Sequence, residues 1–294
     1  MMIQTIRGDG KAMTAWITRQ PSADELERYR LMISLVNAQK GFARQWKNNI
    51  PYPDFQLMEE VFAEAFGGRS CRGKDVFDVL VQDSTSPQRY FGIQLKMKGA
   101  FGPGSSYATL SNTGQMPRNP RLYVEMSNPQ NATIAASGTT QQELLNHTAN
   151  VGTAGQGIMN WIQQKHNNAG QNHLDLPQGC TIDVASSVTI LMTWAIHNGV
   201  VRYWLHSFAH ELPAMPIWAY TPGANSKSIR GFESQAQFNT GIQSIDWSFS
   251  SGGQIKWYPL ASTATQSYGP FDLEPTANQQ SLEAVARVIF PNFP

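Results

Sequence analysis

Apolar residues recur at helical spacing in two stretches near the N-terminus. Ser22 can cap the first stretch, and Glu25 three residues later completes a capping box, so the apolar positions that follow predict a helix over 22–47. Asp54 can cap the second stretch, whose apolar side chains share one face and predict a helix over 55–66.

Alternating or continuous apolar stretches bounded by turn residues predict strands in much of the remaining chain. The predicted strands cover 76–82, 90–98, 121–126, 188–196, 200–205, 242–249 and 254–258. A polar connection over 83–89 joins the first two strands into a hairpin. Asn198-Gly199, the favoured dipeptide of a tight type I′ turn, joins the fourth strand to the fifth.

The other segments complete a single-domain α/β pattern. Residues 99–120 are rich in Gly, Pro, Ser and Asn and predict an extended loop, and Thr140 with Glu143 predicts a helix start. That helix should run to about Lys165, and the glycines Gly152, Gly155 and Gly157 within it indicate a helix break or a close packing site. A terminal helix is predicted over 278–289.

The expected architecture is one domain, 1–294, with a mixed central sheet flanked by helices. Residues 22–206 form its helical region and core, and 207–294 form a β-rich C-terminal elaboration. The length of 294 residues and the 41% hydrophobic content are sufficient for a sizeable core.

Net charge and cysteine content exclude few classes of function. A net charge of +1 neither predicts nor excludes nucleic acid as a partner, and two cysteines, Cys71 and Cys180, do not make a disulfide framework. The N-terminus has no apolar stretch of signal-peptide length, and no run of about 18 apolar residues occurs. We therefore expect a cytoplasmic protein without a membrane span.

The first predicted hairpin carries polar side chains in apolar surroundings. Gln94 and Lys96 alternate with apolar residues, so they share one face of their strand, and a hairpin centred near Ser86 places Asp78 opposite Gln94. Buried polar groups are costly unless they are paired or bind something. We therefore expect Asp78, Gln94 and Lys96 to converge on one point.

These groups suit hydrolytic chemistry with a hard cation. The Asp78 carboxylate, the Gln94 side-chain oxygen and the backbone carbonyl of Leu95 are oxygen ligands of the kind that Mg²⁺ prefers. Lys96 would hold or help deprotonate the attacking water, or stabilise charge on a phosphate.

Asp78, sixteen positions before the tripeptide Gln94-Leu95-Lys96, resembles the site motif of the PD-(D/E)XK nuclease superfamily, which includes most type II restriction endonucleases. The resemblance covers roughly residues 54–196 and implies a restriction-endonuclease-like core and Mg²⁺-dependent hydrolysis of DNA phosphodiesters. Two departures are the lack of a Pro before Asp78 and the Gln at position 94, where an acid is usual.

The resemblance also implies an acidic residue on the helix before the strands and a set of partners. Glu59, Glu60 and Glu64 are the candidates, and helical spacing places Glu60 and Glu64 on one face. The substrate would be double-stranded DNA. A two-fold symmetric site would favour a homodimer, and the host would need a cognate DNA methyltransferase.

Other interpretations remain open. The hairpin could hold an ordinary surface ion pair, Asp75 could replace Asp78 if a bulge turned it to the same face, and the β-rich region could be a non-catalytic module that binds carbohydrate or protein. A DNA-repair or mobile-element nuclease is a third alternative. The pair His206 and His210 lacks the Glu of a zinc protease, and Cys71, beside Arg72, is expected to be a surface thiol.

Two further groups of residues are candidates for other functions. The carboxylates Glu211 and Glu233 are a weak candidate for a glycosidase pair. Seven basic residues are candidates for DNA contacts: Lys98, Arg118, Arg121, Arg202, Lys227, Arg230 and Lys256.

Overall fold

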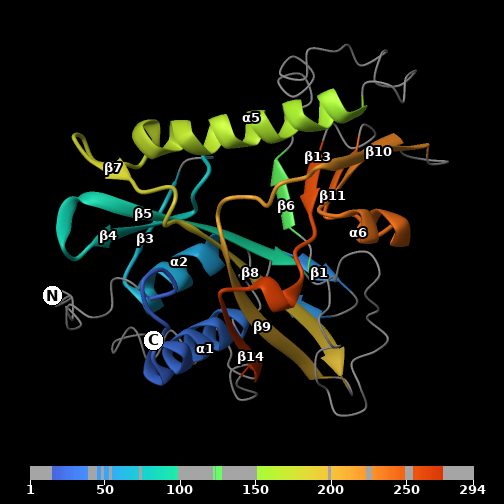
Figure 1. Cartoon of the computed structure of the whole chain (residues 1–294). Coiled ribbons are helices and arrows are strands. Elements are labelled where there is room, and N and C mark those ends of the chain that lie inside the picture. Colours follow the sequence, from blue (N-terminus) through green and yellow to red (C-terminus); the bar gives the residue numbers. More distant parts are fainter. Residues whose placement is uncertain are drawn as a thin grey trace, which may run out of the picture.

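The protein combines two β-sheets with helices in a mixed α/β architecture, as the sequence predicts (Figure 1). The computed structural model describes residues 15–38, 45–47, 50–52, 55–72, 75–98, 122, 124–127, 151–197, 200–222, 227–248 and 254–273. Among these residues, no helix is both long enough and apolar enough to cross a membrane.

The larger sheet has seven strands in the order β14-β9-β8-β5-β4-β3, with β7 added beside β5. Its strands are β3 (Arg69–Ser70), β4 (Val79–Asp83), β5 (Ser86–Lys98), β7 (Thr181–Ile182), β8 (Val188–His197), β9 (Val200–Ala209) and β14 (Gln266–Asp272). β5 runs parallel to β7 and β8, and the other pairs are antiparallel. The sheet is therefore mixed.

Helices α1 (Ala23–Ala38) and α2 (Phe55–Phe66) cover one face of this sheet (Figure 1). The predicted capping box is present, since the Glu25 N–H donates to Ser22 Oγ and the Ser22 N–H donates to Glu25 Oε2. The contact layer is aromatic, with Tyr29 of α1 packed edge-on against Phe62 of α2.

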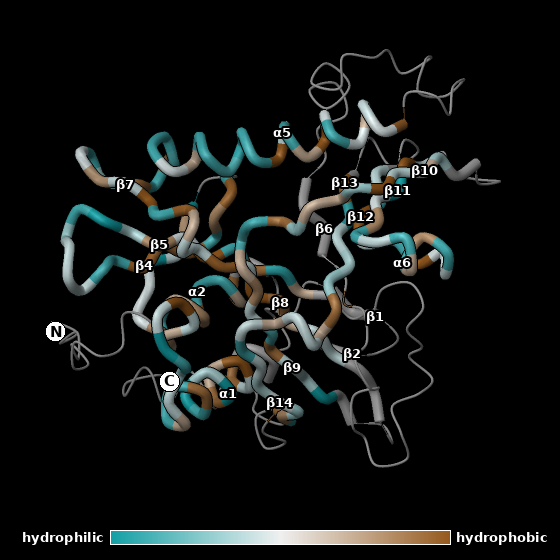
Figure 2. Tube along the Cα trace, in the orientation of Figure 1, coloured by the Kyte–Doolittle hydropathy of each residue, from teal (hydrophilic) through white to brown (hydrophobic). Residues whose placement is uncertain are grey.

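The 22-residue helix α5 (Val151–Asn172) lies over the opposite face of the sheet (Figure 1). Hydrophilic residues predominate along it (Figure 2), and amide side chains on its exposed side pair four residues apart, as in Gln163 with Asn167. Gly155 is a close packing site: a Cβ there would lie 2.0 Å from the Trp218 ring. None of the three glycines interrupts the helix.

The smaller sheet is antiparallel, in the order β10-β11-β12-β13-β6. Its strands are β6 (Val124–Ser127), β10 (Ile217–Pro222), β11 (Lys227–Phe232), β12 (Ile245–Ser248) and β13 (Gln254–Trp257). Helix α6 (Gln235–Thr240) connects β11 to β12, starting at the cap Ser234. β6 precedes α5 in the chain, so this sheet is not formed by the C-terminal region alone.

Two small elements complete the described chain. β1 (Gln45–Lys47) pairs antiparallel with β2 (Ile50–Tyr52) as a separate two-stranded sheet. The 3-10 helix η5 (Ala261–Thr263) precedes β14.

Most predicted elements are confirmed, but several boundaries are wrong. The predicted helix over 22–47 ends at Ala38, and the predicted end of α5 at Lys165 falls seven residues short of Asn172. β5 begins at Ser86, because the Asp83 carboxylate accepts hydrogen bonds from the Thr85 N–H and hydroxyl and closes a short turn. The predictions for 99–120, 140–150, 198–199 and 278–289 lie outside the described residues.

Candidate functional site

Asp78 and Lys96 lie together on the face of the larger sheet that α5 covers. Val79 pairs with Ile93, so Asp78 and Gln94 are the next residues outward on the two strands, as the predicted register requires. Asp78 Oδ2 accepts a 2.7 Å hydrogen bond from the Leu95 N–H and lies 3.4 Å from Lys96 Nζ. Both charged side chains retain some exposure, 19% for Asp78 and 27% for Lys96.

Burial raises the pKa of the Asp78 carboxyl, although the Lys96 ammonium and the Leu95 N–H act in the opposite direction. The existing partners therefore compensate the desolvation of this carboxylate only in part. Both hydrogen bonds described for Asp78 end at Oδ2. No hydrogen bond to Oδ1 is found among the described residues, and a cation near this atom would stabilise the charged form.

Gln94 is buried on the same face and belongs to a row of polar side chains. Thr189 on the neighbouring strand β8 places its hydroxyl 3.5 Å from Gln94 Oε1 and 3.2 Å from His210 Nδ1. His210 Nε2 has no partner among the described residues. Burial lowers the pKa of His210 to about 3, so its imidazole is neutral near pH 7.

Helix α5 brings further titratable groups over this row. His166 packs against His210 with ring centroids 3.9 Å apart and ring planes tilted by 32°, and burial lowers the pKa of His166 to about 4. The pKa of Lys165 is lowered by burial and by Lys96, while Asp75 acts in the opposite direction. The sequence does not predict this contact, because Lys165 and His166 meet the larger sheet only through the packing of α5 on it.

Helix α2 does not bring Glu60 or Glu64 to this group. Met58, Val61 and Phe62 of α2 face the apolar side of the sheet, opposite to the face that carries Gln94. Glu60 is exposed, and Glu64 pairs with Arg28 of α1 at 2.9 Å.

Asp75, the alternative metal-binding acid, has a structural role. Its Oδ1 accepts a hydrogen bond from the Val76 N–H, and its Oδ2 accepts one from the Leu174 N–H at 3.2 Å. Asp75 therefore fastens the segment that follows α5 to the segment that precedes β4.

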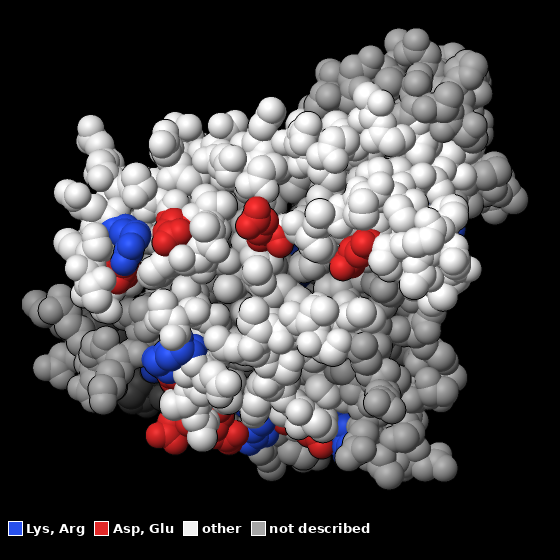
Figure 3. All heavy atoms as spheres, viewed as in Figure 1, with Lys and Arg blue, Asp and Glu red and all other residues white. Residues whose placement is uncertain are grey.

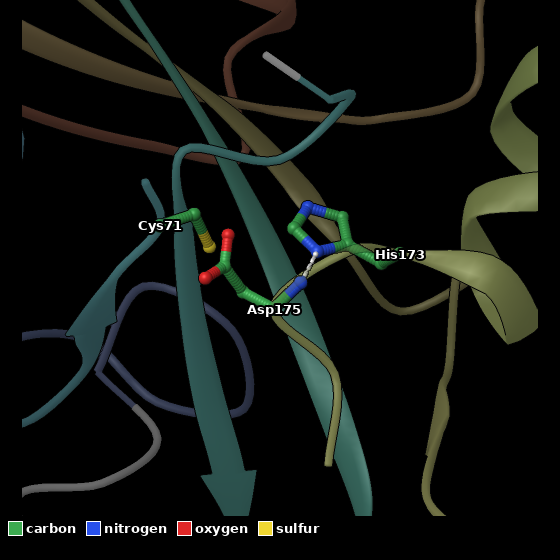
Figure 4. Close-up of side chains that lie close together, drawn as sticks. All are labelled: Cys71, His173 and Asp175. Carbon is green, nitrogen blue, oxygen red and sulfur yellow. Dashed lines mark hydrogen bonds between the residues drawn. The ribbon is translucent and has the colours of Figure 1, made fainter. Parts of the chain in front are cut away.

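Two residues of the segment that follows α5, His173 and Asp175, form a second cluster with Cys71 (Figure 4). Cys71, His173 and Asp175 each offer one ligand atom within 4.8 Å of the others. Contrary to the sequence prediction, Cys71 is buried and has a histidine nearby. Its pKa is raised to about 12 by burial, then by Asp175 and Asp78, so the thiol is protonated and a weak nucleophile near neutral pH.

Several basic residues predicted to contact DNA lie beside acidic residues in the structure. Arg202 Nε lies 3.5 Å from Asp272, and in the smaller sheet Asp246 stands between Arg230 and Lys256 across the strands. The side chains of Lys98 and Lys227, together with Arg118 and Arg121, lie outside the described residues. On the face shown in Figure 3 the described charges are scattered, without a continuous basic stripe.

No protein-family model, no curated protein and no solved structure matches this chain. The fold and the site therefore identify only a broad class of protein. The protein is a mixed α/β protein whose larger sheet carries an acid–lysine pair on one face and whose second, antiparallel sheet packs against the same long helix.

Proposed function

We propose that the chain is a Mg²⁺-dependent endonuclease that hydrolyses phosphodiester bonds of double-stranded DNA, of the type II restriction class. The observation that carries the proposal is the Asp78–Lys96 pair, held at 3.4 Å between the residue that directly precedes β4 and the adjacent strand β5, beside the buried Gln94. A partly desolvated acid with a raised pKa next to a lysine is typical of sites where charge is used in chemistry.

The donor set suits the proposed cofactor. Asp78 would supply a carboxylate oxygen, Gln94 its amide oxygen and Leu95 its backbone carbonyl, all hard ligands. Mg²⁺ bound there would polarise the phosphate and lower the pKa of a coordinated water. Because Gln94 is neutral where an acid would add a charge, we expect binding to be weaker than in a two-carboxylate site.

Lys96 would act on the reacting atoms. Its ammonium is now 3.4 Å from Asp78, a long contact that can be exchanged for a contact to the phosphate or to the attacking water. The neutral imidazoles of His166 and His210 would add no charge to this site near pH 7. On this proposal the enzyme works in the cytoplasm, as a homodimer on a symmetric site, beside a cognate DNA methyltransferase in the host.

The non-catalytic alternative receives little support from the smaller sheet. Binding of sugars commonly uses exposed aromatic faces, but Trp247 and Trp257 are buried in the core between this sheet and α5. An ordinary ion pair between Asp78 and Lys96 remains the simplest competing interpretation, and the experiment below separates the two.

The test is digestion of plasmid and genomic DNA from several sources with Mg²⁺, comparing wild type with Lys96→Ala and Glu64→Gln. Discrete wild-type fragments are expected, with a loss of about 10²-fold or more in Lys96→Ala. Glu64→Gln is the matched charge control from the opposite face and should cut like wild type. Circular dichroism would verify that all three proteins are folded.

Two results would contradict the proposal. One is equal cleavage by wild type and Lys96→Ala, which would make the pair structural. The other is a folded wild type that cuts none of these DNAs with either Mg²⁺ or Mn²⁺. Fragments without sequence preference would instead favour a repair-type nuclease over a restriction enzyme.

A further inference from the structure

The cluster of Cys71, His173 and Asp175 combines three kinds of metal ligand from distant parts of the chain. Cys71 follows β3, and the other two residues follow α5 about a hundred positions later. Their ligand atoms all lie within 4.8 Å of one another, Cys71 and His173 are buried, and Asp175 is half-buried. A thiol, an imidazole and a carboxylate at this spacing are the donors that Zn²⁺ takes in proteins.

The surroundings hold His173 and Asp175 in orientations suited to a metal. His173 Nε2 lies 3.1 Å from the Phe77 carbonyl oxygen, which leaves Nδ1 as the ring nitrogen for a metal, and in this structure Nδ1 accepts a 3.2 Å hydrogen bond from the Asp175 N–H (Figure 4). A histidine that donates its second ring N–H to a backbone carbonyl is the usual arrangement around protein-bound zinc. Asp175 Oδ2 accepts a hydrogen bond from the Arg72 N–H at 3.0 Å.

Metal binding would also balance the charge of the thiolate ligand. Cys71 is buried, and a thiolate in a buried position is costly without a compensating positive charge. A divalent metal would supply that charge, and the Sγ–H proton would leave to solvent as the sulfur–metal bond forms.

We propose that Cys71 Sγ, His173 Nδ1 and a carboxylate oxygen of Asp175 bind one Zn²⁺ ion, with water as the fourth ligand. The long hydrogen bond from the Asp175 N–H to Nδ1 is given up for the metal. The ion fastens the segment after α5 to the edge of β3 and β4, where Asp75 and Arg69 already contact that segment. This site shares no ligand with the oxygen-ligand site proposed at Asp78, although the Cys71 N–H donates to the Asp78 carbonyl oxygen, and it does not depend on nuclease activity.

The test is metal analysis of the full chain purified without chelators, followed by Co²⁺ titration of the metal-free protein. About one zinc per chain is expected in wild type, together with a thiolate-to-cobalt charge-transfer band on titration. Cys71→Ser and His173→Ala should lose the zinc, and Cys71→Ser should lose the band. Cys180→Ser, which changes the other free cysteine, should keep both.

The outcomes are decisive even if a variant folds poorly, because the wild-type titration needs no variant. A folded wild type that holds no zinc and gives no thiolate–cobalt band overturns the proposal, as does zinc retained at the wild-type level in folded Cys71→Ser. Asp78→Asn separates the two sites: it should abolish Mg²⁺-dependent cleavage and leave the zinc content unchanged.

Discussion

The two faces of the larger sheet are built from the same strands but differ in chemistry. Toward α1 and α2 the strands present apolar residues: Val79, Val81, Ile93, Leu95, Ile190, Met192, Tyr203 and Leu205. Toward α5 the intervening positions include a series of polar residues: Asp78, Gln94, Lys96, Thr189, His206 and His210. The face toward α1 and α2 is thus an apolar core, whereas the face toward α5 also carries buried or partly buried polar side chains.

This difference indicates where the sheet serves stability and where it serves something else. Among the described residues an unpartnered polar atom occurs on both faces, since Ser207 Oγ on the α1 and α2 face also lacks a partner, but the two unpartnered imidazoles and the carboxyl with a raised pKa lie on the α5 face: His206, His210 and Asp78. A chain selected for stability alone would fill such positions with apolar side chains. The α5 face is therefore the one where function is expected, which is the basis of our proposals.

The largest expected effect is a loss of stability at Ile93, compared with its neighbour Gln94, which points to the opposite face of the sheet. Ile93→Ala should lower the free energy of unfolding by about 3 kcal/mol, because Ile93 is fully buried and its truncation leaves a cavity. Gln94→Ala should cost about 1 kcal/mol or less, since its contact with Thr189 is a long 3.5 Å and Thr189 keeps His210 as a partner. Urea unfolding of the metal-free proteins measures both changes.

Equal losses of unfolding free energy in Ile93→Ala and Gln94→Ala would contradict the difference between the two faces. Such a result would mean that Gln94 supports the fold as strongly as the apolar core does, and its burial would then need no functional explanation.

The second effect is a loss of stability in acid that arises on the α5 face. Burial lowers the pKa of His206 to about 4, below the value near 6.5 of the unfolded chain. The unfolded state therefore binds the proton first, and the stability due to neutral His206, complete above pH 6.5, is lost as the pH falls toward 4. Between pH 7 and about 4.5 this contribution should amount to about 2 kcal/mol.

His206→Asn tests this contribution, because the amide keeps a polar atom for the 3.0 Å contact that His206 Nδ1 makes with Ser267 Oγ. Unfolding free energies of wild type and variant, measured in urea at several pH values, should converge as the pH falls. Parallel pH profiles would show that His206 titrates normally in the folded state.

The apolar face was the more predictable of the two. Alternation along β5 from Ile93 to Met97 and a hairpin centred near Ser86 predict the register that places Val79 opposite Ile93, and one apolar stripe predicts the bounds of α2. The smaller sheet was only partly predicted. Its strand β6 comes from residues 124–127, and such a non-local pairing leaves no periodic signal in the sequence.

The two candidate sites also differ in how far the sequence predicts them. Asp78, Gln94 and Lys96 could be found because two neighbouring strands carry them. The proposed zinc ligands could not, since Cys71 and His173 meet only after α5 has crossed the sheet. His206 and His210 have helical spacing in the sequence, but His206 lies on β9 and His210 directly follows it, so the even spacing places both on one sheet face.

The smallest effect concerns how α5 is held over the polar face. The Trp218 ring lies between Gly155 of α5 and Gly231 of β11, so a Cβ at Gly155 would overlap it at 2.0 Å, whereas a Cβ at Gly152 meets nothing within 4 Å. Gly155→Ala should therefore destabilise the protein by about 1–2 kcal/mol despite its better helix propensity. Gly152→Ala, the matched control, should stabilise it by about 0.5 kcal/mol. Thermal and urea unfolding would measure both, and the same sign for the two variants would mean that Trp218 does not fix the position of α5.

If α5 covers the proposed nuclease site, Gly155→Ala should also lower the cleavage rate, while Gly152→Ala should leave it unchanged.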